Sequence, residues 1–459
     1  MWYPDPETLH APLHASLAAA IKQAILTEEL PAGARLPPHR RMANRLGLSV
    51  HTVSKAYDSL RKQNLVDGQV GRGSYVCGTV PRTVPLQTEP EEEFDFSTSR
   101  PVYSQEHNNR FQHSLQEIAA ELDSSVLQGC GSVSESDAHR DAGAQWLAAC
   151  GYPAGPDQVL LTNGGSQGFS TALSALTRPG DTVLSDGITH NLLVSGCSYL
   201  GLKQLSLKAD TQGILPEALA EASLASGAKV LCLLPSLANP VPVMMPEGRR
   251  RELVQIAEDH DLYVIEADPL GPVTEDRPPP VSALLPERSI YMTAFSTCLM
   301  PGLQAGYMAA PSHLLPPLKS RLLSFGGTAV PLMRELASRW VLDGTALEFA
   351  DWQRNALESR HSIACRVLHG MPWTGHPSAL HLWLPLPEGW SSVRFLQYAS
   401  KMQIALMPDM PFLAPGTSSP NALRISLGGI QEDSHFRKGL ELTAALLKLQ
   451  PHCLPHLAF

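Results

Sequence analysis

A chain of 459 residues is longer than one hydrophobic core usually organises, so we expect at least two domains. Its composition, 43% hydrophobic and 17% charged residues, excludes a largely disordered chain, and no apolar run approaches the roughly 20 residues that cross a bilayer. The net charge of −9 is unevenly divided, since residues 1–78 carry a net +3 and the remainder a net −12. This balance is expected when only the basic head meets a polyanion.

The N-terminus and the cysteines indicate a cytoplasmic protein. Residues 1–7 lack the basic region and following apolar stretch of a secretion signal. The eight cysteines form no C-x-x-C pair, which argues against a zinc site or a disulfide framework. We therefore expect reduced thiols and no metal centre, with Cys298 set apart by its place beside Thr297.

Residues 13–62 have the pattern of three short helices. Apolar side chains at three- and four-residue intervals predict the first over residues 13–30 and the second over residues 40–46, which Gly47 ends. Ser49 has the chemistry of an N-cap for the third helix. The later two helices form a helix-turn-helix, whose second member is the candidate for the DNA major groove. The polar face of that third helix carries His51, Thr52, Ser54 and Lys55.

A glycine-rich hairpin follows the third helix. Residues 65–66 and 75–76 are strand-like runs that bracket residues 67–74, a pattern typical of a wing. Gly71 and Gly73 allow the tip to come close to a nucleic-acid backbone, and Arg72 supplies a positive charge there.

Together these features resemble the winged helix of the GntR family of bacterial regulators. The matching residues are Gly33-x-Arg35-Leu36-Pro37, Arg40, Leu46-Gly47-Leu48-Ser49, Thr52-Val53, Ala56-Tyr57, Leu60 and Gly71-x-Gly73. The resemblance implies DNA contacts from Arg35, Arg40, Ser49, His51, Thr52, Lys55, Arg72 and Gly73. The family usually has arginine after the capping serine, whereas this chain has Val50 and His51, so its base preference should differ. A winged helix that does not bind DNA is the alternative.

Residues 79–95 are expected to be a linker between a DNA-binding domain at 1–78 and a large domain at 96–459. Residues 79–93 contain three prolines and four acids without periodicity, which predicts an extended, solvated tether. Beyond it, short buried β-type runs alternate with helical stretches. The runs lie at residues 159–161, 182–184, 230–234, 263–265 and 290–292. This alternation predicts an α/β fold with a mostly parallel sheet between helices, and ligands at the carboxyl ends of its strands.

The residues after these runs form an ordered series. The series consists of the glycine-rich turn 162–168, Gly180-Asp181, Asn239-Pro240, Glu266-Ala267-Asp268-Pro269, Phe295-Ser296-Thr297 and Leu423-Arg424-Ile425-Ser426. It resembles class I aminotransferases of fold type I, a resemblance that implies a large domain and a smaller C-terminal α+β subdomain. Joined to a GntR head, the chain resembles MocR-type regulators. That resemblance implies pyridoxal phosphate (PLP) as a sensory cofactor and a homodimer that binds double-stranded operator DNA.

Carried onto this chain, the aminotransferase site is partly retained. Asn239 matches the asparagine that contacts the phenolic oxygen of PLP, and Arg424 matches the arginine that binds a substrate carboxylate. Ser166 and Gln167 fall in the phosphate-binding turn, and Ser296 is also retained.

The groups that control the chemistry of PLP are absent. Thr297 replaces the lysine that forms the Schiff base, and a hydroxyl cannot form an imine. The other replacements are Ala267 for the aspartate at the pyridine nitrogen, Leu270 for a tyrosine, Gln304 for a phosphate-binding arginine and His190 for the stacking aromatic residue. Asp268 could replace the missing aspartate only by a shift of one residue, which in a strand points the side chain to the opposite face.

We therefore expect a homodimeric transcriptional regulator, not an enzyme, that holds no covalent PLP and senses a small effector, such as a carboxylate. The expected pocket consists of Ser166, Gln167, His190, Asn239, Asp268, Ser296, Thr297 and Arg424. One alternative is a PLP-binding sensor with non-covalent PLP or with residual aminotransferase activity. Another is a true enzyme fused to a DNA module, and a third is a scaffold that only dimerises the DNA readers. Arg424, Asn239 and His190 also have purely structural interpretations.

Overall fold

The chain divides into two compact units at residues 86 and 87, inside the predicted linker. The structure, a computed structural model, describes residues 2–6, 9–10, 12–26, 29–30, 34–62, 66–69, 73–76, 93–121, 136–327 and 329–449. Most of the predicted linker, at 79–92, lies outside the described residues.

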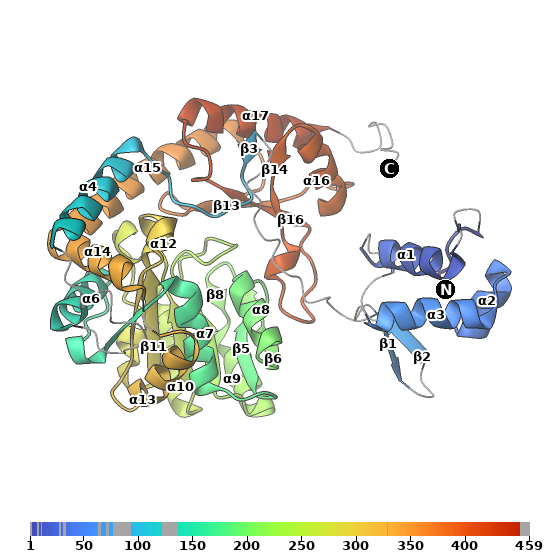
Figure 1. The fold of residues 1–459 in the computed structure, drawn as a ribbon, viewed down its shortest axis with the longest axis horizontal. Coiled ribbons are helices and arrows are strands. Elements are labelled where there is room, and N and C mark those ends of the chain that lie inside the picture. Colours follow the sequence, from blue (N-terminus) through green and yellow to red (C-terminus); the bar gives the residue numbers. More distant parts are fainter. Residues whose placement is uncertain are drawn as a thin grey trace. The chain divides into compact units, whose positions relative to one another are not determined.

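The first unit has three helices and a hairpin where the sequence predicts them, except that the first helix ends at Leu26 and does not include residues 29–30 of its predicted range (Figure 1). Its elements are α1 (Leu13–Leu26), α2 (His39–Leu46), α3 (Val50–Lys62) and the antiparallel strands β1 (Val66–Gln69) and β2 (Gly73–Val76). Gly47 ends α2 with a left-handed φ of 66°, a conformation that glycine adopts without strain. Ser49 caps α3, because its Oγ accepts a hydrogen bond from the backbone N–H of Thr52 at 3.0 Å.

One face of each helix closes the core of the first unit. Leu17 and Ile21 from α1 and Val53 and Tyr57 from α3 are fully buried, at the three- and four-residue spacing that defines a helical stripe. The Tyr57 hydroxyl donates to the backbone oxygen of Pro37 at 2.8 Å, which satisfies the one polar atom that this ring buries.

The second unit is built on a seven-stranded sheet with the order β4-β12-β11-β10-β9-β5-β6. The strands are β4 (Val159–Thr162), β5 (Thr182–Asp186), β6 (Lys203–Leu207), β9 (Val230–Leu233), β10 (Tyr263–Ala267), β11 (Ser289–Ala294) and β12 (Gly306–Ala309). The five runs expected from the sequence are β4, β5, β9, β10 and β11. β12 runs antiparallel to both of its neighbours, and the neighbouring pairs from β11 to β6 are parallel.

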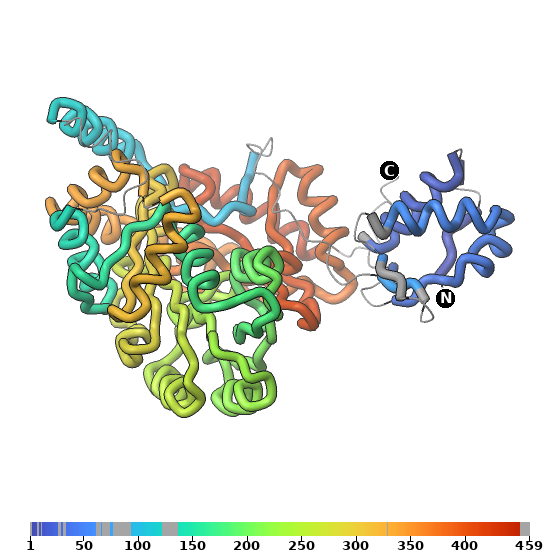
Figure 2. The backbone as a smooth tube through the Cα atoms, turned by 60° about the horizontal axis from the view of Figure 1, so that its bottom comes forward, coloured from blue at the N-terminus to red at the C-terminus, as the bar shows by residue number. Residues whose placement is uncertain are grey.

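Helices cover both faces of this sheet, as continuous apolar strands require (Figure 2). One face packs against α7 (Gly164–Leu176), α8 (Asn191–Tyr199) and α13 (Leu315–Ser324). The opposite face packs against α9 (Pro216–Ser226), α10 (Glu247–Asp259) and α11 (Val281–Leu284) on one side and α6 (Asp137–Ala149) on the other. The short pair β7 (Ala209–Asp210) and β8 (Gly213–Ile214) and the helix α12 (Phe295–Cys298) complete this part.

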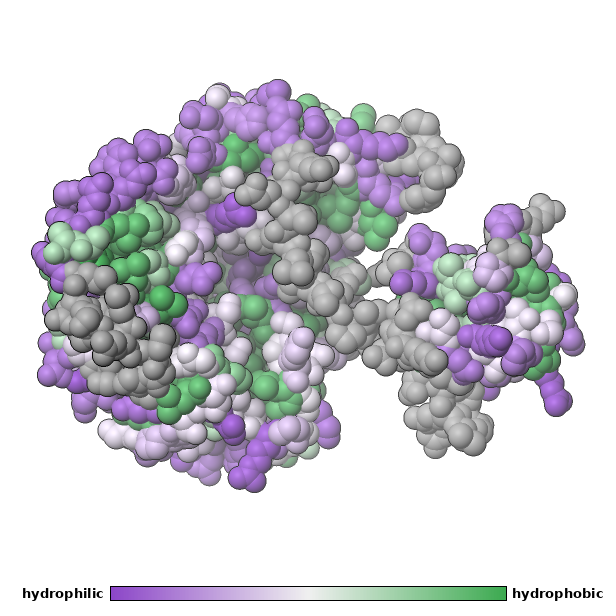
Figure 3. Space-filling view, viewed as in Figure 1, coloured by the Kyte–Doolittle hydropathy of each residue, from purple (hydrophilic) through white to green (hydrophobic). Residues whose placement is uncertain are grey.

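A smaller subdomain contains a three-stranded antiparallel sheet, β13-β16-β15. Its strands are β13 (His381–Pro385), β15 (Met407–Pro408) and β16 (Ala422–Ser426), accompanied by α16 (Ser392–Lys401), α17 (Asp433–Lys448) and the parallel pair β3 (Phe94–Asp95) and β14 (Ile404–Ala405). The remaining helices are α4 (Gln105–Glu121), α14 (Pro331–Leu342) and α15 (Thr345–Val367). Figure 3 shows mainly hydrophilic residues over α4 and α17, as expected for the solvent face of amphipathic helices.

Candidate functional site

Arg424 in β16 lies in the interior of the second unit. It is 4% exposed, and its Nη1 donates to the Asn239 side-chain oxygen at 3.1 Å while its Nη2 donates to the Ser97 backbone oxygen at 2.6 Å. The guanidinium carbon lies 5.0 Å from the centre of the Phe412 ring, which is cation–π distance. Nε is buried and has no hydrogen-bond partner among the described residues. Asn239 and Ser97 therefore fix the position of the Arg424 guanidinium, and some of its N–H groups remain available to a ligand.

Two histidines share this environment. His190 caps α8, where its Nδ1 accepts from the Leu192 backbone N–H at 3.1 Å, and His381 in β13 is 2% exposed with Nε2 at 3.3 Å from the Ala238 oxygen. Burial and then the Arg424 charge lower the pKa of His190 to about 4 and that of His381 to about 3.

Burial also lowers the pKa of Arg424 to about 10, against the opposing effect of Asp95, so the guanidinium remains charged at neutral pH. At pH 7 the site thus presents one cation, Arg424, and two neutral imidazoles that interact with it.

The structure brings together three of the predicted pocket residues, Arg424, Asn239 and His190. Three further residues of this environment, His381, Ser97 and Phe412, were not predicted from the sequence. His381 gives little signal, because it begins an apolar strand and alternates with Leu382 like any residue of a β pattern. Phe412 and Ser97 lie in irregular segments whose place depends on tertiary packing.

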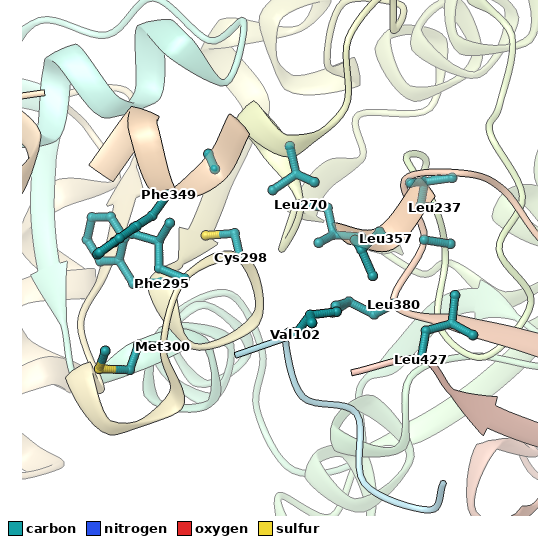
Figure 4. Packing of buried hydrophobic residues seen from close by; sticks show 14 of the residues in the cluster. Val102, Leu237, Leu270, Phe295, Cys298, Met300, Phe349, Leu357, Leu380 and Leu427 are labelled. Atoms are coloured by element: carbon teal, nitrogen blue, oxygen red, sulfur yellow. The ribbon is translucent and has the colours of Figure 1, made fainter. Parts of the chain in front are cut away.

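Thr297 lies in α12, directly after β11, at the carboxyl edge of the sheet. Its hydroxyl donates to the backbone oxygen of Pro269 at 2.9 Å, and Ser296 beside it is half-buried. Leu270 is buried in the main core together with Cys298 and Leu357 (Figure 4). Ala267, at the end of β10, packs against the apolar cluster on the other face of the sheet.

Asp268 is bound to groups of its own. The residue is 1% exposed, and its Oδ2 forms an ion pair with Arg277 and accepts a hydrogen bond from the Tyr291 hydroxyl at 2.5 Å. Arg277 also donates to the backbone oxygen of Cys150. Oδ2 of Asp268 is thus engaged in a buried network, whereas Oδ1 is buried with no hydrogen-bond partner among the described residues. Membership of Asp268 in the pocket stays a prediction.

The glycine-rich turn before α7 is held by Gln167. The side chain of Gln167 accepts from the Asn163 backbone N–H at 2.7 Å and donates to the Gly327 backbone oxygen at 2.9 Å. Ser166 and Gln304 are exposed, and Gln304 adopts a positive φ of 42°. Gln167 therefore links α7 to the segment after α13, and the phosphate-binding role of this turn stays a prediction.

The lysines of the second unit are all on its surface. Lys203, Lys208, Lys229, Lys319, Lys401, Lys438 and Lys448 are exposed. Two of them have partners, since the Lys229 amine lies 3.4 Å from the His260 oxygen and the Lys438 amine lies 3.4 Å from Glu93. In the described part of this unit, no buried lysine is available to take the place of the Schiff-base lysine that Thr297 replaces.

The predicted DNA contacts of the first unit gather around α2 and α3. Arg35, Arg40, Ser49, His51 and Lys55 are exposed and Thr52 is half-buried. Arg35 is also bridged to Tyr75 in β2, which joins the segment before α2 to the wing. Gly73 begins β2, and Arg72 lies outside the described residues.

Comparison with protein-family models matches both units. Residues 13–76 match the bacterial regulatory proteins of the gntR family, and residues 91–435 match aminotransferase class I and II. The chain belongs to the class I and II aminotransferases, in the MocR-type group that carries a gntR-family head. This MocR-type chain is a DNA-binding transcription regulator fused to an aminotransferase-like domain.

Relatives of the MocR-type chain include full-length regulators and an enzyme. The HTH-type transcriptional regulator YdeF of Bacillus subtilis is 25% identical over 448 residues, 97% of this chain and 96% of the relative. YjiR of Escherichia coli, also an HTH-type transcriptional regulator, is 26% identical and covers 86% and 90%. The 2-aminoadipate transaminase of Thermus thermophilus is 24% identical over 63% of this chain and 74% of the enzyme.

Solved aminotransferases share the fold of the second unit of this MocR-type chain. A kynurenine aminotransferase from Pyrococcus horikoshii has a TM-score of 0.69 at 23% identity, and it covers 77% of this chain and 90% of its own. A multiple substrate aminotransferase from Thermococcus profundus has a TM-score of 0.70 at 20% identity, with 78% and 92% covered. Within the described residues, no helix is long and apolar enough to span a membrane, and no group of three metal-ligating side chains gathers.

Proposed function

We propose that the aminotransferase-like domain of this regulator no longer performs PLP-dependent transamination and instead senses a small carboxylate that binds at Arg424. The proposal rests on two features of the same domain. Arg424 is buried with an unpartnered Nε, and a threonine, Thr297, stands at the position of the Schiff-base lysine. Binding of the effector would then alter how the two DNA readers of a homodimer engage the operator.

The residues around Thr297 do not fit PLP as a covalent cofactor. The Thr297 hydroxyl is committed to the Pro269 oxygen, Ala267 offers no carboxylate to the pyridine nitrogen, and the Leu270 side chain packs in the apolar core. Asp268, directly after Ala267, has its Oδ2 engaged by Arg277 and Tyr291. Glu266, directly before Ala267, accepts hydrogen bonds from backbone N–H groups of α11. These contacts support a domain that has left aminotransferase chemistry, and we derive no reaction step through the cofactor.

The contacts of Arg424 support a carboxylate ligand. Asn239 and Ser97 each take one N–H of the guanidinium, and a planar guanidinium with five N–H groups retains a fork that matches the two oxygens of a carboxylate. Because His190 and His381 are neutral at pH 7, no second charge from these histidines competes with Arg424 for the anion.

Two measurements test the proposal. Purified protein is titrated with PLP, followed in the near-ultraviolet, reduced with borohydride and weighed intact, because reduction fixes any aldimine covalently. We expect no stoichiometric adduct. One adduct, or transamination of any amino acid, would restore the enzyme and PLP-sensor interpretations. Non-covalent PLP would produce a saturable absorbance change that dialysis removes.

The second measurement compares carboxylate binding by the wild type and two arginine variants. We expect carboxylates to raise the melting temperature of the wild type and of Arg437→Leu, an exposed arginine on α17, but not of Arg424→Leu. If operator affinity does not change with any carboxylate and is the same in Arg424→Leu as in the wild type, the domain would be better described as a scaffold that only dimerises the DNA readers.

A further inference from the structure

Three buried polar atoms without partners among the described residues lie on one face of the small sheet β13-β16-β15. They are Nε of Arg424, Oγ of Ser426 and Nδ1 of His381. Arg424 and Ser426 are two positions apart in β16, so their side chains point to the same face. His381 in β13 is directly opposite Ser426 in the antiparallel register, which places their Cβ atoms about 4.5–5.5 Å apart.

Buried polar side chains usually find a partner, and these three unpartnered groups are set apart by their place on one face of one small sheet. All three residues are nearly inaccessible, with Arg424 4%, His381 2% and Ser426 0% exposed. Each unpaired buried group costs free energy that a bound ligand would recover. The three atoms therefore point to a ligand that satisfies them together.

The chemistry of the His381 atom is fixed by its other nitrogen. The Ala238 backbone oxygen can only accept a hydrogen bond, so Nε2 of His381 carries the proton in that contact. A neutral imidazole protonated at Nε2 has a lone pair at Nδ1, which is an acceptor. Nδ1 of His381 can therefore accept a hydrogen bond from a donor on the ligand, whereas Nε–H of Arg424 can donate to an acceptor on the ligand. The Ser426 hydroxyl can serve either partner.

We propose, building on the proposed carboxylate function, that the effector is a hydroxycarboxylate whose carboxylate binds Arg424 and whose neutral hydroxyl donates to His381 beside Ser426. A hydroxyl fits better than an ammonium group for an electrostatic reason. Asp95 is the acid whose charge acts on Arg424, and its Oδ1 already accepts from the backbone N–H of Ser97 at 2.8 Å and from its hydroxyl at 2.6 Å. An ammonium group would lie near the Arg424 cation, and the carboxylate of Asp95 already interacts with Arg424 and with Ser97.

The test compares ligands that differ only in the substituent on the carbon next to the carboxylate, which is a hydroxyl, a hydrogen or an ammonium group. Lactate, propionate and alanine share a skeleton, as do 2-hydroxy-4-methylpentanoate, 4-methylpentanoate and leucine, and calorimetry gives the affinity of each for the full-length protein. We expect the hydroxy acid to bind roughly fivefold more tightly than the deoxy acid, the value of one neutral hydrogen bond, and the amino acid to bind most weakly.

Variants of the small sheet show which residues cause the preference for the hydroxy acid. His381→Phe should remove the preference for the hydroxy acid while affinity for the deoxy acid stays within about twofold, and Ser426→Ala should reduce it. Ser289→Ala is the matched control, because Ser289 is also a fully buried strand serine whose hydroxyl has no partner among the described residues, but it lies in β11. If His381→Phe does not fold, Ser426→Ala alone decides the outcome.

The outcomes separate this inference from the function on which it rests. Equal binding of hydroxy and deoxy acids, tighter binding of the amino acid, or a preference that survives both β13 and β16 variants would overturn the hydroxycarboxylate assignment and leave the carboxylate sensor standing. If no carboxylate binds, or if binding survives Arg424→Leu, the proposed function falls, and this inference falls with it.

Discussion

The guanidinium of Arg424 donates a 3.1 Å hydrogen bond to the side-chain oxygen of Asn239, a residue 185 positions earlier in the chain. This contact joins the small sheet to the loop after β9 of the large sheet, so the arginine is positioned before any ligand arrives. Preorganisation of this kind lowers the cost of binding an anion, because the side chain loses little rotamer freedom on binding.

DNA binding should depend on Arg40 and Lys55. Arg40→Ala and Lys55→Ala remove exposed charges from α2 and α3, and we expect each to weaken operator affinity. The slope of log K against log salt should become shallower by about 0.9 for each DNA phosphate that the variant no longer neutralises. Fluorescence anisotropy at several salt concentrations measures both quantities. Lys319→Ala, an exposed lysine of the second unit, is the control and should bind like the wild type. Affinity unaffected by either change would refute the winged-helix surface proposed here.

The Ser49 cap should stabilise the DNA-binding unit. Ser49→Ala removes the acceptor for the Thr52 backbone N–H, and we expect the free energy of unfolding of this unit to fall by about 1 kcal/mol. Ser49→Asp restores an acceptor at the N-terminus of α3 and should recover most of that stability. Urea denaturation of the isolated head, followed by circular dichroism, checks the prediction if the head folds alone, and hydrogen exchange of α3 in the full chain serves otherwise. Equal stability of the alanine and aspartate variants would contradict it.

His381 should make the second unit less stable as the pH falls. The ordinary histidine pKa of 6.5 applies to the unfolded chain, whereas burial lowers the folded value to about 3. The unfolded state therefore binds the extra proton first, and stability present above pH 6.5 declines toward the folded pKa. Between pH 7 and pH 5 this histidine should cost about 2 kcal/mol.

The measurement for His381 is the difference in unfolding free energy between the wild type and His381→Phe at these two pH values. Using the difference removes the contributions of other groups, including His190, which the variant retains. We expect the advantage of the wild type to shrink by about 2 kcal/mol at pH 5. A difference that stays constant would show that His381 is solvated enough to titrate normally.

Arg360 should be essential for the packing of α15 against the segment before α17. Its side chain is 1% exposed and donates to the backbone oxygens of Leu427, Ile430 and Gln431 and to Asp433. Arg360→Met leaves these carbonyls buried without donors, so we expect stability to fall by about 3–5 kcal/mol in a denaturant titration. Arg366→Met, on the exposed side of the same helix, should change stability by less than about 0.5 kcal/mol. Similar stabilities of the two variants would refute the role of these hydrogen bonds.

The local pattern of the sequence determined the architecture. Apolar residues at helical spacing, the left-handed Gly47 and the capping Ser49 specify the first unit, because each of these preferences acts within a few residues. The runs that became β4, β5, β9, β10 and β11 were predictable for the same reason. The antiparallel direction of β12 was not, since strand direction depends on how the connection between β11 and β12 folds in space.

Only the tertiary structure decided how the candidate site is assembled. The sequence pointed to Arg424, Asn239 and His190 through order and resemblance, but it offered no reason to include His381, because a histidine in an apolar strand has the same local pattern whether or not it faces a cation. The opposite case is Asp268, which the sequence placed near the pocket and the fold engages with Arg277 and Tyr291. Such contacts join residues that are far apart in the chain, so local spacing does not reveal them. The charge of each group in turn depends on its burial, which only the folded structure shows.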